Sequence, residues 1–323
     1  MTVKGAAIRY FSICASALAF VMLAGCGRYA DFSLPAPEGA RREVRWRWVP
    51  PKEPLLRPAS GEVDVLNPSM ANGKLFYSVF DGKTWYTALD GQRVLAPQGW
   101  EGGYIAANGS VLFHGGQYWH WYHVLGPDIP KIAFARSKDG REWDRDASAA
   151  LDVGPRGSWD ELGVADPYVI ETGGALYLYY LGQDRAKRQR LGVATSTDGH
   201  TWTKLRSNPV LEPGEPGAFD ENGLGEPAVW SSQGTWWMLY TGRARDEVRR
   251  IGLARSADGV RWEKVKGFVI AGDQPWNAKV VCDPHVEPQP DGRVKVWFGG
   301  GDVAHPAERI HGQIGLGELI PES

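Results

Sequence analysis

The sequence repeats one phrase three times: IAFARSKDGREW at residues 132–143, LGVATSTDGHTW at residues 191–202 and IGLARSADGVRW at residues 251–262. The first half of each phrase alternates in polarity as a strand does, and Asp-Gly is a turn signal between two strands. The tryptophan then begins the returning strand. Each phrase therefore predicts a β-hairpin, and we expect Asp139, Asp198 and Asp258 to form its turn.

A second pattern precedes each hairpin. An aromatic residue is followed by an acid or amide and, seven residues after the aromatic one, by an acid that stands before a proline. The aromatic and acidic members are Trp159 with Asp166, Phe219 with Glu226 and Trp276 with Asp283. Trp100 leads to Asn108 with one residue more, and Asn67-Pro68 resembles a first copy without its aromatic leader.

The two patterns recur about every 50 residues, with about four short strands in each unit, and a period of this length is typical of propellers. The sequence predicts an all-β fold, a single five-bladed β-propeller of four-stranded antiparallel blades. The expected blades are 61–98, 99–152, 153–212, 213–270 and 271–320. A β-sandwich is the alternative, but it does not predict a fixed period with a recurring hairpin.

Composition excludes several classes of protein. The 323 residues include 41 Gly, 22 Pro and 15 Trp, and the net charge is −2. A chain with so little net charge lacks the concentrated basic face that nucleic acid requires, so we expect no nucleic-acid partner. Disordered chains avoid aromatic residues. We expect many short strands and tight turns, and a monomer.

The N-terminal segment has the pattern of a secretory signal. Lys4 and Arg9 precede an apolar stretch at residues 11–25 that is short for a membrane span. Its end, Leu-Ala-Gly-Cys26, resembles the lipobox of bacterial lipoproteins. This implies a signal peptide at 1–25, lipidation of Cys26, a Pro- and Arg-rich tether at 26–60 and a propeller at 61–323. An ordinary signal peptide or an uncleaved anchor is the alternative.

The lipobox resemblance also implies a location. We expect a lipid-anchored protein of the cell envelope, at the outer membrane and facing the periplasm or the cell surface. Cys14 lies in the signal and Cys26 carries the lipid, so Cys282 alone remains in the mature chain. We therefore expect no intramolecular disulfide.

The residues before the prolines point to a site. The first strand of each blade lines the channel of a propeller, so the residues that open these strands should form a ring, in blade order Asn67, Asn108, Asp166, Glu226 and Asp283. Converging carboxylates raise at least one pKa, which provides a protonated acid beside ionised ones. Turn capping before proline explains Asp and Asn but explains Glu226 poorly.

The arrangement resembles the five-bladed glycosidases of glycoside hydrolase families 43 and 62 and their relatives in families 32 and 68. The resemblance covers nearly the whole mature chain. It implies a glycoside hydrolase in which the first strands of blades one, three and four supply a general base, a modulating Asp and a Glu general acid. The matching residues are Asn67, Asp166 and Glu226.

Asn67 departs from the family pattern, because an amide cannot take a proton from water. The base is then another carboxylate, or the chemistry differs, or activity is lost. Asp283 and Asp64 are the expected catalytic substitutes, and Asp81 and Glu101 are remoter ones. A glycoside phosphorylase dispenses with the base, because phosphate replaces activated water.

Other residues are expected to bind substrate or metal. Sugar rings stack on aromatic faces, so we expect substrate binding by the ring amides and by side chains near the aromatic strands: Asn67, Asn108, Trp85, Trp121, Arg243 and His285. The spacing of His and Cys residues predicts no transition-metal site. No cofactor is expected to be required, and the resemblance leaves room for a structural Ca²⁺ near His285.

The expected function is hydrolysis of an extracytoplasmic poly- or oligosaccharide by carboxylate acid/base catalysis. The catalytic residues are then Glu226, Asp166 and either Asp283 or Asp64. A non-catalytic glycan-binding lipoprotein is the first alternative, because Asn67 lacks an acidic group. A structural lipoprotein of an envelope complex is another, and it predicts a large exposed apolar patch.

Overall fold

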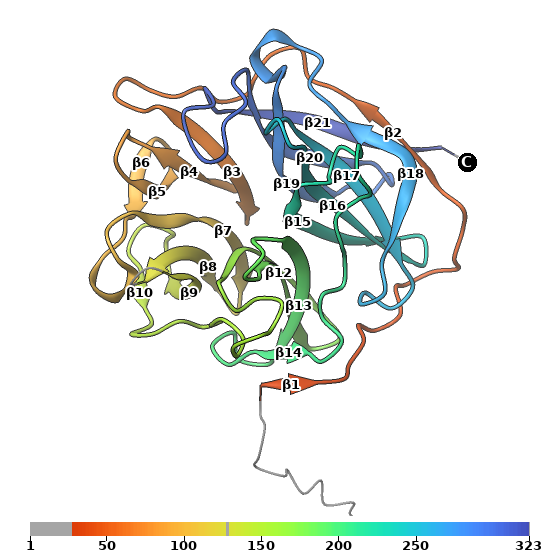
Figure 1. Cartoon of the computed structure of the whole chain (residues 1–323), viewed down its shortest axis with the longest axis horizontal. Coiled ribbons are helices and arrows are strands. Elements are labelled where there is room, and N and C mark those ends of the chain that lie inside the picture. The colour runs from red at the N-terminus through yellow and green to blue at the C-terminus, as the bar shows by residue number, and fades with distance from the viewer. Residues whose placement is uncertain (1–27, 127–128, 323) are drawn as a thin grey trace, which may run out of the picture.

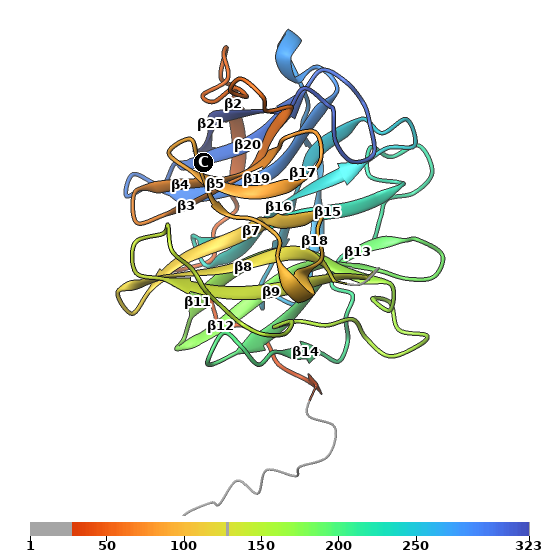
Figure 2. The same cartoon turned by 90° about the vertical axis from the view of Figure 1, so that its left-hand side faces the viewer.

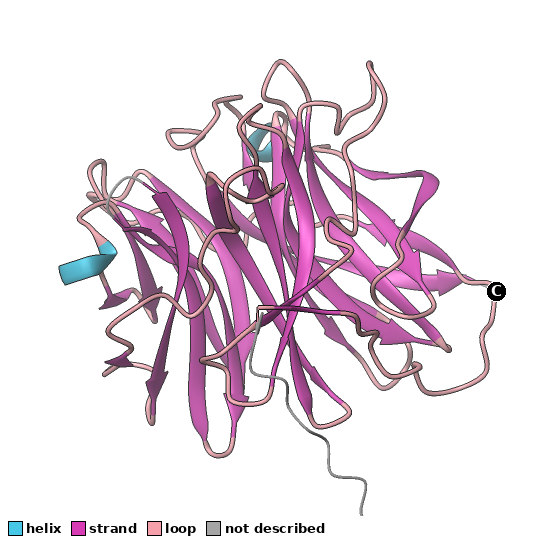
Figure 3. Cartoon of the chain, turned by 60° about the horizontal axis from the view of Figure 1, so that its bottom comes forward, coloured by secondary structure: helices cyan, strands magenta, loops and turns pink. Residues whose placement is uncertain are grey.

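A computed structural model describes residues 28–126 and 129–322. Strands dominate these residues, and the helical elements are two short 3-10 turns, η1 (Gly99–Glu101) and η2 (Pro275–Asn277) (Figure 3). The predicted all-β class is confirmed. No helix within the described ranges is long and apolar enough to cross a bilayer. The signal peptide and the lipidation site Cys26 fall outside the described residues and stay predictions.

The strands pair as five successive antiparallel groups of four, which we call groups 1 to 5. Group 1 is β3 (Asp64–Ala71), β4 (Lys74–Phe80), β5 (Trp85–Leu89) and β6 (Gln92–Leu95). Group 2 is β7 (Ile105–His114), β8 (Gln117–Gly126), β9 (Ile129–Ser137) and β10 (Asp144–Arg145). Group 3 is β11 (Gly163–Thr172), β12 (Ala175–Gln183), β13 (Gln189–Ser196) and β14 (Thr203–Leu205).

Group 4 is β15 (Gly223–Ser232), β16 (Thr235–Arg243), β17 (Arg249–Ser256) and β18 (Glu263–Ile270). Group 5 is β19 (Val280–Pro288), β20 (Val294–Gly301), β21 (Gln313–Glu322) and β2 (Arg45–Val49). The first strands contact one another in a closed cycle, β3 to β7 to β11 to β15 to β19 and back to β3. Figure 1 shows the groups arranged around this shared centre, and Figure 2 shows the same strands from the side.

The N-terminal region belongs to the fold, so the predicted tether at 26–60 is wrong in part. Strand β2 pairs with β21 and completes group 5, and β1 (Tyr29–Ala30) pairs with β14. Leu34 and Trp46 are buried in the core. The alternation of Arg45-Trp-Arg-Trp-Val49 is a strand signal, but its partner lies about 270 residues away at the other end of the chain, at Arg47 against Ile320.

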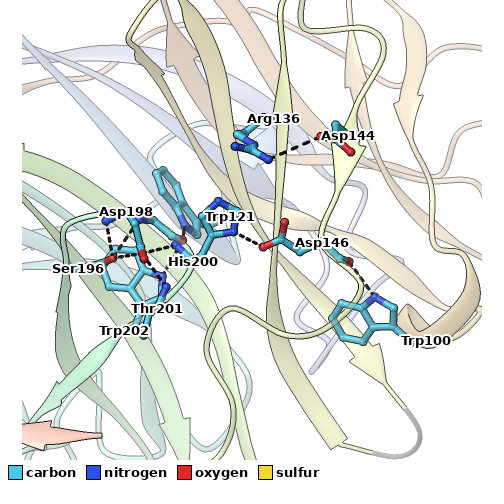
Figure 4. Close-up of polar contacts among 11 residues, drawn as sticks. Trp100, Trp121, Arg136, Asp144, Asp146, Ser196, Asp198, His200, Thr201 and Trp202 are labelled. Carbon is cyan, nitrogen blue, oxygen red and sulfur yellow. Dashed lines mark hydrogen bonds and ion pairs between the residues drawn. The ribbon is translucent and has the colours of Figure 1, made fainter. Parts of the chain in front are cut away.

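The repeated hairpins form as predicted. In each one, the Ser hydroxyl accepts the backbone N–H of the Gly three residues on, and an Asp oxygen accepts backbone N–H groups beyond the turn. Asp139, Asp198 and Asp258 are therefore turn residues, as expected. The hairpin of group 3 is drawn in Figure 4, where Asp198 bonds the backbone of Thr201.

The hairpins also join neighbouring groups. Trp121 of β8 donates its indole N–H to the carbonyl of Gly199 at 2.8 Å, and Tyr179 of β12 donates its hydroxyl to the carbonyl of Gly259 at 2.7 Å. His200 and Asp146 add a contact of 2.6 Å between groups 2 and 3 (Figure 4). These contacts hold group 2 against the hairpin of group 3, and group 3 against the hairpin of group 4.

A buried carboxylate anchors the middle groups. Asp160 accepts hydrogen bonds from Tyr180 and Lys204, and its side chain is fully buried. Asp220 with Tyr240 and Lys264, and Glu101 with Tyr122 and Arg145, repeat the arrangement. In group 5, Asn277 takes the place of the acid and Phe298 takes the place of the tyrosine. The acid after the aromatic leader therefore pairs with a tyrosine and a cation from later strands.

The aromatic leaders explain several glycines. A side-chain carbon on Gly182 or Gly192 would lie 2.3 or 2.5 Å from the ring of Trp159. The ring thus lies against bare backbone of the second and third strands of group 3, where no larger residue fits.

We expect Asp160→Ala to lower the free energy of unfolding by about 3–5 kcal/mol, because it leaves the ammonium of Lys204 buried without its partner. The matched control is Glu53→Ala, which breaks an exposed pair with Arg57 and should cost less than about 1 kcal/mol. Urea unfolding monitored by tryptophan fluorescence measures both. Equal effects of the two substitutions would contradict this role of Asp160.

Candidate active site

Each first strand contains the same irregularity. Its pairing register shifts at the ring position, where one residue adopts left-handed backbone with φ between 47° and 51°: Asn67, Asn108, Asp166, Glu226 and Asp283. Left-handed backbone costs a residue with a side chain about 1–2 kcal/mol, and such bulges re-aim side chains. The ring residues do not open their strands as expected, because each strand begins three residues earlier.

A cavity of about 250 Å³ lies at this end of the first strands. All five groups line it. Its polar lining comes from the ring residues Asn108, Asp166, Glu226 and Asp283 and from the residues Tyr104, His123, Gln183, Gln189, Thr241, Arg243 and Arg249. Trp85 and Leu66 form part of its apolar wall. The structure thus brings three of the four predicted catalytic acids to one cavity.

Glu226 and Asp283 are linked through the backbone. The N–H of Asp283 donates to an oxygen of Glu226 at 3.2 Å and to the hydroxyl of Thr241 at 3.2 Å. One oxygen of Asp283 accepts the N–H of Asn67 at 3.3 Å and the thiol of Cys282 at 3.1 Å. Neighbouring groups therefore meet through side-chain-to-backbone bonds between ring residues.

Burial and mutual repulsion change the acidity of this cluster. Burial raises the pKa of Asp166 well above its ordinary value, and the charges of Glu226 and Asp283 raise it further. Burial raises the pKa of Asp283 to about 8, and the charge of Glu226 contributes to the rise. The cluster therefore holds protons at neutral pH, as a site that donates a proton requires.

Arg249 supplies positive charge next to the acids. Its side chain is buried; burial lowers its pKa, but the charges of Cys282, Glu226 and Asp283 outweigh this and raise it overall. Its guanidinium also donates to the carbonyls of His305 and Pro306 at 2.9 and 2.7 Å. Arg243, which was predicted to bind substrate, lines the cavity and donates to Gln189 at 2.6 Å.

Two predicted catalytic or substrate-binding residues have other partners. Asp64 is fully buried, and its two oxygens accept the backbone N–H groups of Arg309 and Gly312 at 2.6 and 2.7 Å. Asp64 lies outside the cavity lining, and its hydrogen bonds hold the loop between β20 and β21 in place. Trp121 is not a substrate-binding residue, because its ring is fully buried between groups 2 and 3.

Of the other predicted binding residues, some line the cavity and some do not. Trp85 and Asn108 line the cavity. His285 is buried between the rings of Tyr168 and Trp297, lies outside the cavity lining, and accepts the N–H of Met70 at 3.2 Å. The oxygen of the Asn67 side chain accepts the hydroxyl of Ser78 at 3.4 Å.

Six polar residues of the cavity lining were not predicted from the sequence: Tyr104, His123, Gln183, Gln189, Thr241 and Arg249. Arg249 begins β17, two residues before the repeated hairpin phrase, and this is a usable signal for its position. Tyr104 follows the turn η1, where no repeat marks it.

One described cluster has metal-ligand atoms within 4.8 Å of one another: Glu226, Cys282 and Asp283. Ca²⁺ prefers six to eight oxygen ligands, and a thiol does not fit that set. The positive charge of Arg249 already acts on all three groups. These residues therefore do not fit a calcium centre, and the expected Ca²⁺ near His285 stays a prediction.

Comparisons with known proteins show the family to which the chain is related. Residues 103–280 match the model of the glycosyl hydrolases family 32 N-terminal domain. An uncharacterized protein of Mycobacterium tuberculosis is 31% identical over 139 residues, 41% of this chain and 44% of that protein. The raffinose invertase of Escherichia coli is 27% identical over 210 residues, 59% of this chain and 40% of the invertase. The match spans less than half the length of each relative.

A solved structure shows the same fold. A thermostable family-43 glycoside hydrolase has a TM-score of 0.61 at 17% identity, over 80% of this chain and 93% of that chain. At this identity the likeness concerns the fold, which is all-β and propeller-like.

The raised pKa of Asp283 makes a prediction for stability. An acid with a raised pKa in the folded state stabilises the protein fully below its unfolded pKa and loses that contribution as the pH rises through the folded pKa. The loss should therefore fall between about pH 4 and the folded pKa of about 8. Asp283→Asn removes it, so the stability of the variant relative to the parent should increase across this window.

Urea unfolding at several pH values between 4 and 8 measures this difference. Asp291→Asn is the control, because Asp291 is exposed and bonds Arg293 on the surface, so it should show no such increase. A difference for Asp283→Asn that is constant with pH would contradict the raised pKa.

Proposed function

The chain belongs to the family of the glycosyl hydrolases family 32 N-terminal domain, and on this premise we propose that it hydrolyses glycosidic bonds of an extracytoplasmic poly- or oligosaccharide. The observation that carries the proposal is the meeting of Asp166, Glu226 and Asp283 at one cavity. Glycoside hydrolysis uses two carboxyl groups, one protonated and one ionised. The raised pKa of Asp166 and Asp283 supports a shared proton in this cluster.

Glu226 is the proposed general acid, which protonates the oxygen of the leaving group. Asp283 is the proposed second carboxylate, in place of the amide Asn67. Asp166 is proposed to bind the sugar unit and to keep the proton within the cluster, since its own pKa responds to Glu226 and Asp283. Because burial and the charges of neighbouring carboxylates raise the pKa of both Asp166 and Asp283, a proton stays in the cluster until substrate enters.

The spacing of the carboxyls favours a double displacement. An oxygen of Glu226 and an oxygen of Asp283 lie within 4.8 Å of one another. Retaining glycosidases hold their carboxyl groups about 5–5.5 Å apart, and inverting ones about 6.5–9.5 Å apart. We therefore assign attack on the anomeric carbon to the ionised form of Asp283, which exists once its proton has moved within the cluster to Glu226. Glu226 passes this proton to the leaving group as the bond to the anomeric carbon breaks. Glu226 then takes a proton from water, which cleaves the glycosyl ester.

The molecular setting of this function is also proposed. The closed cycle of first strands supports a five-bladed propeller with one active-site mouth. The lipobox-like Cys26 supports a lipid anchor at the outer membrane, and we propose a monomer that meets its carbohydrate outside the cytoplasm.

A non-catalytic glycan-binding protein is the second candidate, and Asn67 favours it. The amide stands where the family resemblance expects a carboxylate base. This candidate predicts sugar binding without product. A glycoside phosphorylase differs from the hydrolase and from the glycan-binding protein because its reaction requires inorganic phosphate.

We expect Glu226→Gln to abolish hydrolysis of whichever polysaccharide the parent cleaves, in a panel of arabinan, xylan, inulin, mannan and raffinose. The neutral amide cannot donate a proton, and loss of general acid catalysis costs about 10²–10⁴-fold in rate. Released sugar measured by anion-exchange chromatography gives the result. Asp291→Asn is the control and should keep the parental rate. Full activity of Glu226→Gln would overturn the assignment.

Azide separates the roles of the two carboxyls. With Asp283→Ala, azide can enter the space of the lost carboxylate and attack the anomeric carbon, so we expect rescue with a glycosyl azide of inverted configuration. Proton NMR of the product determines the configuration. A glycosyl azide of retained configuration would show that Asp283 is not the nucleophile.

A further inference from the structure

The N-terminal strand of the described chain lies at the outer edge of group 3. The strands of this sheet follow the order β11, β12, β13, β14 and β1, so β11 is innermost and β1 is outermost (Figure 1). With strands about 4.8 Å apart, β1 lies about 19 Å from β11. Asp166 of β11 lines the cavity. The chain therefore enters the fold at the rim of the molecule, far from the acid cluster.

Backbone hydrogen bonds fix this entry point. The carbonyl of Arg28 accepts the N–H of Lys204 at 2.8 Å. The carbonyl of Ala30 accepts the N–H of Arg206 at 2.9 Å. The guanidinium of Arg206 also donates to the carbonyl of Tyr29 at 3.3 Å. From Arg28 onwards the chain is therefore attached to β14 and is not a free linker.

The proposed lipid anchor is close to this entry point along the chain. Gly27 alone separates Cys26 from Arg28. Because a chain spans at most about 3.6 Å per residue, the α-carbons of Cys26 and Arg28 lie within about 7 Å of one another. A link of this length leaves no slack for the domain to turn over the membrane. A lipid on Cys26 therefore brings the rim at β1 and β14 to the bilayer.

The surface beside this rim suits the interface of a bilayer. An open groove next to β1 is lined by apolar side chains of the loop between β10 and β11, among them Ala149 and Val153. The partly exposed rings of Tyr29 and Trp100 line the same groove. Aromatic side chains of this kind are enriched where proteins meet lipid headgroups.

The groove also has a net positive charge. Its charged lining consists of the cations Arg28, Lys131 and Lys204 and the acid Asp152. Lys131 pairs with Asp152, and Lys204 pairs with the buried Asp160. The charge of Arg28 remains in excess. This charge suits anionic phospholipid headgroups.

We propose that the short link between Cys26 and Arg28 holds the molecule edge-on on the bilayer, with the groove against anionic headgroups. The inference rests on the lipid anchor that the proposed function includes. In this orientation the cavity opens sideways, along the membrane. The acid cluster lies about 20–30 Å from the headgroups, a distance set by the strands between β1 and β11. This position favours a carbohydrate that lies close to the membrane.

Single labelled cysteines test the orientation. Ser148→Cys lies in the groove, Arg47→Cys on the outermost strand of group 5, and Asp291→Cys in the turn between β19 and β20. The full chain is purified as a lipoprotein and placed in phosphatidylethanolamine vesicles with about one quarter phosphatidylglycerol. Some headgroups carry a nitroxide, which quenches a fluorophore only at short range. Cys282 is buried, so the protein without an added cysteine is the labelling control.

The three positions give distinct results. We expect the fluorophore at position 148 to lose most of its fluorescence, and those at positions 47 and 291 to keep it. Weak quenching at position 148, or equal quenching at all three positions, would overturn the inference. Mass spectrometry of the purified protein checks the anchor separately. A mature chain without lipid on Cys26 would overturn the proposed anchor and the inference with it.

A longer link tests the cause of the orientation. Ten Gly and Ser residues inserted between Gly27 and Arg28 form a flexible coil that spans about 17 Å. We expect the quenching at position 148 to fall at least about twofold, because a longer link lowers the effective concentration of the rim at the bilayer. The same insertion after Asp291 is the control and should leave this quenching unchanged. Unchanged quenching after the insertion at Gly27 would overturn the inference.

Discussion

Left-handed backbone in the middle of every first strand is the constraint on which the site depends. A regular strand would alternate its side chains across the sheet, whereas the bulge re-aims the side chain at this one position. Five bulges with φ near 50° place five equivalent side chains around one centre. The fold thus fixes where these side chains lie, and the sequence at each position decides whether the ring carries an amide or an acid.

The surroundings of a buried carboxylate decide whether it stabilises the fold or supplies a proton for a reaction. Asp160 and Asp220 are as deeply buried as Asp166, but each binds a lysine ammonium and a tyrosine hydroxyl. Asp166 and Asp283 instead face another carboxylate, so their pKa values rise. A buried acid with a cationic partner stabilises the fold, whereas acids that share one cavity hold protons that a reaction can use.

The features that recur in the repeats could be predicted from the sequence. The contacts between distant segments of the chain could not. Period and spacing located the hairpin turns and the ring of Asp166, Glu226 and Asp283, because each of these features is local. The partner of β2 lies at the opposite end of the chain. The burial of Trp121, and the hydrogen bonds of Asp64 to the loop between β20 and β21, depend on neighbouring groups. Such contacts leave no periodic trace in the sequence.

The proposed chemistry depends on the sharing of a proton among Asp166, Asp283 and Glu226, which the bulges bring to one place. Carbon-13 NMR titration of protein labelled at the aspartate carboxyl carbons measures it directly. We expect at least two aspartate signals to titrate well above the ordinary value of about 3.9, and one of them to disappear in Asp283→Asn while the other shifts. If every aspartate signal titrated below about pH 5, the carboxyls would not share a site and the account would be wrong.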